Sequence, residues 1–165
     1  MTEKEALKQL EETSEQALLE ALEFVREEGT NKLLVKSIQL LAHTENKQVQ
    51  KKGIQLIEDL KQDEAAEVLA EALDQEEYAS IHATLLSACW KNGRNYAAYL
   101  PTFIRHFIDQ PFEVAFEAFT VIEQQPVSPN QASEALLELK EQQGVITDEK
   151  KALYTQLLDL LNSRI

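Results

Sequence analysis

The chain has 165 residues, of which 44% are hydrophobic, and its 29 acidic and 16 Lys and Arg side chains leave a net charge of −13. This length and composition allow a buried core and exclude a disordered, fibrous or disulfide-stapled protein. The acidity argues against binding to DNA or RNA, because phosphate contacts depend on Lys and Arg. With no signal-peptide pattern and no apolar run of membrane-spanning length, the expected location is the cytoplasm.

Apolar residues recur at helical spacing along nearly the whole chain, and strand patterns are almost absent. We therefore predict an all-α protein with helices of about 12 to 16 residues, close to the usual length in globular proteins. Turn and capping residues predict the breaks between these helices. The breaks lie near residues 29–31, 44–46, 62–63, 76–77, 92–95, 110–111, 126–129 and 144–148.

The N-terminal segment, residues 1–29, is predicted to form a helical cap with its apolar side chains on one side and glutamates on the remainder. The alternative for this segment is a short coiled coil, because apolar and small residues recur at intervals of three and four. Those residues are Leu7, Leu10, Ser14, Ala17, Ala21 and Phe24. Ser and Ala would make such a seam weak.

Three successive segments share one hydrophobic register. They are residues 30–62, 63–95 and 96–128. In the second helix of each, apolar or small residues recur at positions 0, +4, +5, +7 and +8, counted from Val49, Ile81 and Val114. A helix pair of this size cannot bury its apolar face alone, so neighbouring pairs must stack into a single α-solenoid domain over residues 1–165. Residues 129–165 are predicted to add a C-terminal helix pair.

The segment from Leu100 to Ile122 resembles a HEAT repeat. Units of that family have a proline in the first helix, an Asp and often a Pro in the turn, and a Val followed by small residues in the second helix. The matching residues are Pro101, Asp109, Pro111, Val114 and Ala118. The other two segments keep the hydrophobic spacing but lack the first-helix proline. Tetratricopeptide and armadillo arrays are the neighbouring families, and their patterns fit less well.

The family commonly has a basic residue just after the valine, and this chain has Gln50, His82 and Ala115 there. The resemblance implies a right-handed α-α superhelix with the second helices on its concave side, where the family binds partners. It brings no common catalytic residues. Any function of this chain must therefore be sought on its surface.

Positions that point away from the apolar stripe of each second helix supply the candidate partner-binding residues, because a helix turns about 100° per residue. They include the only Trp of the chain, Trp90, and aromatic side chains are enriched at interfaces. The candidates are Trp90, Phe116, Thr84, Ser87, Thr120, Lys51 and Lys52. The alternative for Trp90 is packing against Tyr96 or Tyr99. Residues 30–62 are the only basic segment, with six lysines against three acidic residues.

Catalytic and metal-binding motifs are absent from the sequence: the three His lack metal-ligand spacing, and Cys89 falls on a core stripe. We expect no catalytic residues, no metal and no cofactor. The sequence favours a non-enzymatic protein–protein interaction scaffold, monomeric or weakly dimeric, that binds neither nucleic acid nor membrane. One alternative is an acidic decoy or inhibitor of a nucleic-acid-binding protein. A less favoured one is a HEAT-like DNA glycosylase, which needs a more basic face.

Overall fold

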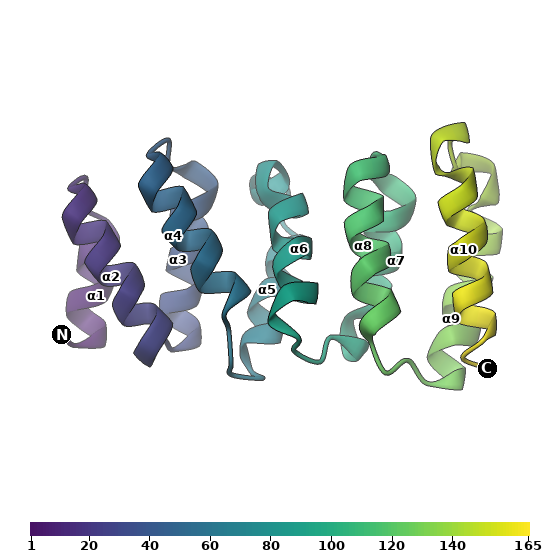
Figure 1. The fold of residues 1–165 in the computed structure, drawn as a ribbon, viewed down its shortest axis with the longest axis horizontal. Coiled ribbons are helices and arrows are strands. Elements are labelled where there is room, and N and C mark those ends of the chain that lie inside the picture. The colour runs from purple at the N-terminus through teal and green to yellow at the C-terminus, as the bar shows by residue number, and fades with distance from the viewer. The chain divides into compact units, whose positions relative to one another are not determined.

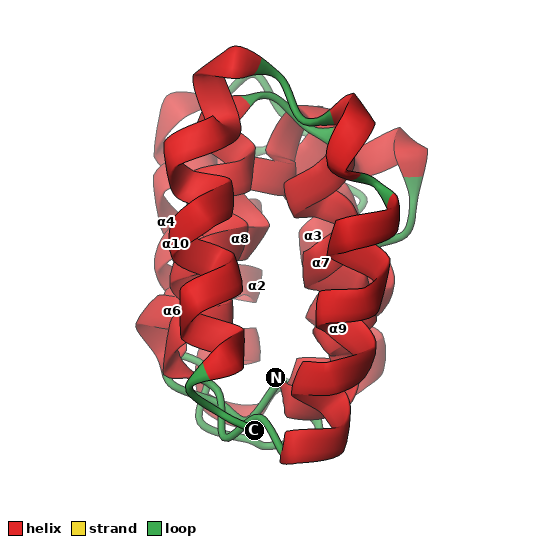
Figure 2. Ribbon diagram, turned by 90° about the vertical axis from the view of Figure 1, so that its right-hand side faces the viewer, coloured by secondary structure: helices red, strands yellow, loops and turns green.

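The computed structural model describes all residues from 1 to 165, and the chain consists of helices and loops without a strand (Figures 1 and 2). The all-α prediction is confirmed. The α-helices are α1 Glu3–Gln9, α2 Glu15–Glu28, α3 Asn31–His43, α4 Lys47–Glu58, α5 Ala65–Leu73, α6 His82–Asn92, α7 Leu100–Asp109, α8 Phe112–Gln124, α9 Pro129–Glu141 and α10 Lys151–Asn162. None of them is long and apolar enough to cross a lipid bilayer.

The chain divides into two compact units, Met1–Arg94 and Asn95–Ile165. The division falls one residue before the boundary predicted between the second and third repeated segments. In the first unit, α2, α4 and α6 contact one another in order, and α1, α3 and α5 do the same behind them (Figure 1). In the second unit, α8 contacts α10 and α7 contacts α9. We call α2, α4, α6, α8 and α10 the second helices and their partners the first helices.

Polar residues begin several helices at the predicted breaks by accepting a hydrogen bond from an amide that the helix itself leaves unpaired. The Thr30 hydroxyl accepts from the Leu33 amide at 3.4 Å, and the Asn46 side chain accepts from the Val49 amide at 3.1 Å. Gly93 ends α6 with a φ of 68°, in the left-handed region that favours glycine. The sequence therefore marks both ends of these helices locally.

The N-terminal segment differs from the prediction, because it contains two helices, α1 and α2, where one cap helix was expected. The backbone of Ser14 is extended, and its hydroxyl accepts a hydrogen bond from the Ala17 amide at 3.3 Å, so a new helix starts there. The coiled-coil alternative is wrong, since no continuous helix runs from Leu7 to Phe24. Instead α1 packs against α2 as a further helix pair.

Two further predictions about the helices are wrong. The break predicted near residues 76–77 is not followed directly by an α-helix, because Glu76–Ile81 form a 3-10 helix and α6 begins only at His82. The ring nitrogen Nε2 of the buried His82 lies 3.0 Å from the Gln75 carbonyl oxygen. This contact connects the first residue of α6 to the residue before the 3-10 helix. Several helices are also shorter than about 12 residues, the extreme being α1 with 7. Stacking between pairs compensates, because tertiary packing supplies most helical stability in proteins.

The hydrophobic register is confirmed. All fifteen predicted stripe positions are shielded from solvent, twelve of them buried and three, Ile54, Ile81 and Val114, partly buried. None of the positions predicted to face outward on these helices is buried. The division into a core side and an open side can therefore be followed residue by residue along α4, α6 and α8.

Polar contacts in the first unit join the ends of its second helices at the repeat spacing. The Arg26 guanidinium pairs with Asp59 at 3.2 Å, and the Lys91 ammonium pairs with Glu58 at 3.1 Å. Arg94 Nη1 donates to the Lys61 carbonyl oxygen at 2.8 Å. Each contact spans 33 residues. Polar contacts of this kind therefore join the C-terminal ends of α2 and α4, and again those of α4 and α6.

In the second unit, the buried side chain of Lys150 closes the C-terminal end of α7. Its ammonium donates to the main-chain carbonyl oxygens of Phe107, Ile108 and Gln110 at 2.9, 2.7 and 2.8 Å. Carbonyls in the last turn of a helix have no partner within the helix, and a cation suits the negative end of its dipole. Burial lowers the pKa of Lys150, while the nearby carboxylates, Asp109 and Glu149, oppose that shift.

Replacing Lys150 with Met should lower the free energy of unfolding by about 1 to 3 kcal/mol, because three carbonyls lose their donor in a buried place. Urea denaturation of the full chain, followed by circular dichroism, measures the change. The matched control is Lys151→Met, since Lys151 is exposed and pairs only with Asp148. Equal effects of the two substitutions would contradict the role given to Lys150.

Candidate functional site

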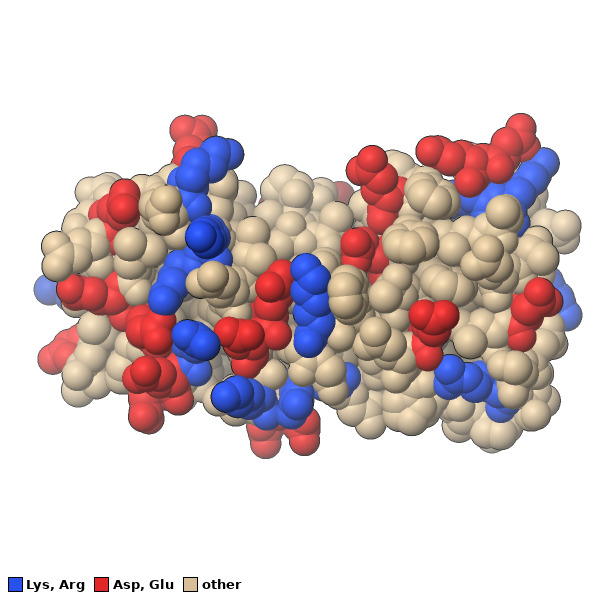
Figure 3. Space-filling model, viewed as in Figure 1, with Lys and Arg blue, Asp and Glu red and all other residues tan.

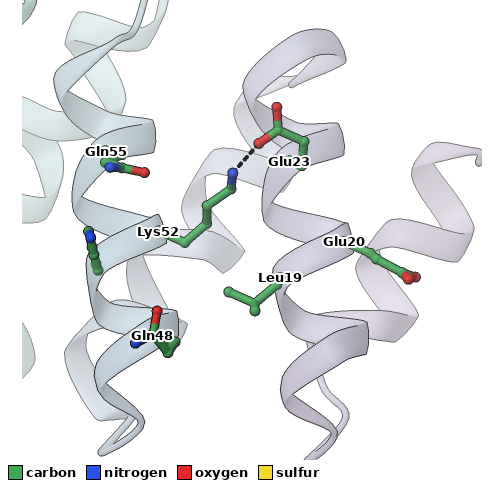
Figure 4. A pocket seen from close by; sticks show the side chains of 7 residues that line it. Leu19, Glu20, Glu23, Gln48, Lys52 and Gln55 are labelled. Atoms are coloured by element: carbon green, nitrogen blue, oxygen red, sulfur yellow. Dashed lines mark ion pairs between the residues drawn. The ribbon is translucent and has the colours of Figure 1, made fainter.

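An open hollow of about 450 Å³ lies between the second helices α2 and α4 of the first unit (Figure 4). We call it the α2–α4 groove. Its walls are Leu19, Glu20 and Glu23 from α2 and Gln48, Lys51, Lys52 and Gln55 from α4. Both lysines predicted as partner-binding residues therefore belong to one site, and its volume is in the range of sites for small ligands or short segments.

The helical period places these side chains along one side of α4. Residues 48, 52 and 55 are separated by four and three positions, so they share a face, while the Val49 and Leu56 side chains are buried on another. At Gly53 the helix comes close to α3, since a Cβ there would lie 3.3 Å from Leu41 Cδ1. The buried face fixes α4 against its neighbours and leaves the groove side open.

An ion pair between Glu23 and Lys52 spans the groove, and Figure 4 shows the lysine reaching from α4 to the carboxylate on α2. Glu23 also pairs with Arg26 at 3.6 Å. The hydrogen bond from Lys52 lowers the pKa of Glu23, helped by the charges of Lys52 and Arg26 and opposed by partial burial. The charge of this carboxylate is therefore balanced within the site.

The remaining acidic side chain of the groove, Glu20, points away from it in Figure 4 and accepts a hydrogen bond from Gln16 at 3.2 Å. The remaining cation, Lys51, is exposed and makes no ion pair, and neither does the exposed Lys47 one turn earlier on α4. Figure 3 shows basic side chains gathered over this helix. The α4 side of the groove thus carries uncompensated positive charge on a chain that is acidic overall.

The aromatic candidates have different surroundings. Phe116 on α8 is 48% exposed, and its ring lies 6.0 Å from the ring of the partly buried Phe112. Thr120, one turn further, donates its hydroxyl hydrogen to the Phe116 carbonyl oxygen at 2.9 Å. Trp90 on α6 is partly buried, with the Lys91 ammonium 5.4 Å from its ring centroid. Phe116 is the more accessible of the two aromatic rings.

The predicted site residues are divided between the two compact units. Lys51, Lys52, Thr84, Ser87 and Trp90 belong to the first unit, and Phe116 and Thr120 to the second. The two lysines share a hollow, the α2–α4 groove. Thr84 and Ser87 are partly buried on α6.

Sequence reasoning missed the contribution of α2, because residues 1–29 were treated as a cap. Leu19 and Glu23 line the groove from that helix. The signal was present in Ser14, a strong N-cap residue that starts a helix in register with α4. Gln48 and Gln55 also line the groove and lie at positions predicted to face outward. They were not chosen as candidates, because a neutral amide on an exposed helix face does not by itself indicate a binding site.

The single cysteine of the chain lies in the core. Cys89 is fully buried, as its place on the apolar stripe of α6 predicted. No group of three or more His, Cys, Asp or Glu side chains is arranged to hold a metal ion.

The Glu23 carboxyl should titrate below its ordinary pKa of 4.5, and Lys52→Met should raise its midpoint toward that value. Because the folded-state pKa is lowered, the stabilisation from the pair is complete above the ordinary pKa and is lost as the pH falls through the lowered one. Carboxyl carbon chemical shifts followed by NMR across acidic pH measure this. Lys51→Met is the control and should leave Glu23 unchanged; an equal effect would contradict the pairing.

Comparisons with known proteins do not assign this chain to a family. No family model, curated protein sequence or solved structure matches it. The site described above therefore rests on the residues of this chain alone. What they offer is an open groove with local positive charge in the first unit and an exposed aromatic side chain in the second.

Proposed function

We propose that this chain is a non-enzymatic protein-binding module that contacts its partner through its second helices. The observation that carries the proposal is the exposed ring of Phe116 on α8, with Phe112 beside it. A large apolar ring held in water contributes little to the fold, and its burial by a partner is favourable. Aromatic side chains of this kind are enriched at the centres of protein–protein interfaces.

The surroundings of Phe116 suit such an interface. Glu113 and Glu123 are exposed on the same helix, so polar side chains flank the aromatic pair. An apolar centre with a polar rim is the usual composition of a recognition surface. The α2–α4 groove supplies a second contact area on second helices, in the other unit.

The proposal includes a finer description of the fold. We infer that the helix pairs are HEAT-like units of a right-handed α-α superhelix, with the second helices on the concave side. Support comes from the shared hydrophobic register and from polar contacts that recur every 33 residues in the first unit. Arrays of stacked pairs present extended surfaces, which suits a scaffold better than an enclosed catalytic site.

Phe116→Asp should reduce partner binding about tenfold or more, because it removes an apolar anchor and places a charge at the interface. The chain, purified with an affinity tag, is used to capture its partner from the native cell, and the captured partner is then titrated against each variant. Leu137→Asp is the matched control, since Leu137 is 62% exposed but lies on the first helix α9.

Thermal unfolding of both variants shows whether they remain folded. The proposal predicts nearly unchanged melting temperatures, with binding lost only in Phe116→Asp. Equal binding by the two variants, or loss only in Leu137→Asp, would contradict the use of the second helices as the binding surface.

A further inference from the structure

The geometry of the α2–α4 groove points to its ligand: we infer that it binds an extended peptide segment of the partner that carries Asp or Glu side chains. This inference rests on the proposed function and names the chemistry of the partner. It is argued from the charge of the groove, from the spacing of its polar groups and from its one apolar wall residue.

The charge of the groove selects an acidic ligand. Lys52 is engaged by Glu23, whereas Lys51 and Lys47 make no ion pair on the same helix. Some other lysines of the first unit have carboxylate partners of their own, as Lys36 has in Glu11 and Lys91 in Glu58. An incoming carboxylate would therefore meet unbalanced lysines at this place, and complementary charge favours both encounter and correct orientation.

The spacing of the two glutamines favours a peptide ligand in an extended conformation. Gln48 and Gln55 are seven residues apart on α4, which corresponds to about 10 Å along the helix axis. Three residues of an extended peptide span about the same length. Each glutamine amide has donors and an acceptor, so it can bond the N–H and C=O groups of a peptide backbone at both ends of that span.

Leu19 adds the apolar contact. Figure 4 shows it reaching from α2 toward α4, on the wall opposite the glutamines. Successive side chains of an extended peptide point to opposite sides. A segment lying along the groove can therefore place an apolar side chain against Leu19 and an acidic neighbour toward Lys51. The site consequently favours a sequence that alternates apolar and acidic residues.

A single-stranded nucleic acid is the less suitable polyanion for this groove. None of the lining residues is aromatic, so bases would find no ring on which to stack. The test below includes an oligonucleotide, so that the two kinds of ligand are distinguished.

The test uses NMR of the isotopically labelled full chain, titrated with a peptide of about eight residues that alternates Glu and Leu and is long enough to span both glutamines. The side-chain amide signals of Gln48 and Gln55 and the methyl signals of Leu19 should shift in a saturable way. A peptide with Lys in place of every Glu should leave them unmoved. Equal shifts with both peptides, or no shift with the acidic one, would overturn the inference.

Lys51→Gln should weaken binding of the acidic peptide about three- to fivefold, the size expected for one exposed charge contact. Lys32→Gln is the matched control, because Lys32 is exposed on the first helix α3 and the change in net charge is the same. Equal weakening by both variants would show a general charge effect and overturn the site. Displacement of the peptide by a poly-thymidine oligonucleotide at equal concentration would overturn the ligand class.

The outcome is separable from that of the proposed function. The peptide titration reports on side chains of the first unit, whereas the capture experiment depends on Phe116 in the second. Partner capture that requires Phe116, together with a groove that ignores acidic peptides, would overturn only the inference. A groove that binds the peptide in a chain whose partner ignores Phe116 would overturn the role proposed for Phe116 and leave the inference standing.

Discussion

The structure depends on one constraint: a pair of short helices has more apolar surface than it can bury within itself, so within each unit the pairs pack against one another. In the first unit, α4 meets this constraint from several sides. Val49 and Leu56 join the cluster built around Leu18 and Leu22 of α2, and Gly53 lets α4 approach Leu41 of α3. Once those faces are used for packing, the remaining face of α4 stays open to solvent, and the groove lies there.

Polar groups complete the helix ends that stacking brings together. The contacts of Arg26, Lys91 and Arg94 at 33-residue spacing fasten successive second helices of the first unit. In the second unit, Lys150 supplies one buried cation to three carbonyls at the end of α7. The Lys150 contacts satisfy buried carbonyl groups that would otherwise lose water without gaining a partner, whereas the contacts of Arg26 and Lys91 are exposed ion pairs. These contacts fix the position of each helix end relative to its neighbour, so the exposed face of the helix keeps a defined orientation.

Periodicity and capping residues predicted the helical class, most of the breaks and the stripe of each second helix, because these features are encoded locally. Other features depend on partners distant in the sequence. Lys150 stands beside Glu149 and Lys151 and looks like a surface residue, yet its partners lie about 40 residues earlier in a helix end that the sequence does not mark as buried. Two residues of the groove, Lys51 and Lys52, were predicted as candidates from the outward face of α4, whereas Leu19 and Glu23 required the break at Ser14 to be recognised.

The central claim, that the second helices bind the partner, is tested most directly by hydroxyl-radical footprinting of the full chain with and without the captured partner. Each unit provides an internal comparison: Leu19 against Val35 in the first, and Phe116 against Leu137 in the second. The account predicts that the partner reduces oxidation of Leu19 and Phe116, which lie on second helices, and leaves Val35 and Leu137 unchanged. Protection of Val35 and Leu137 instead would contradict it.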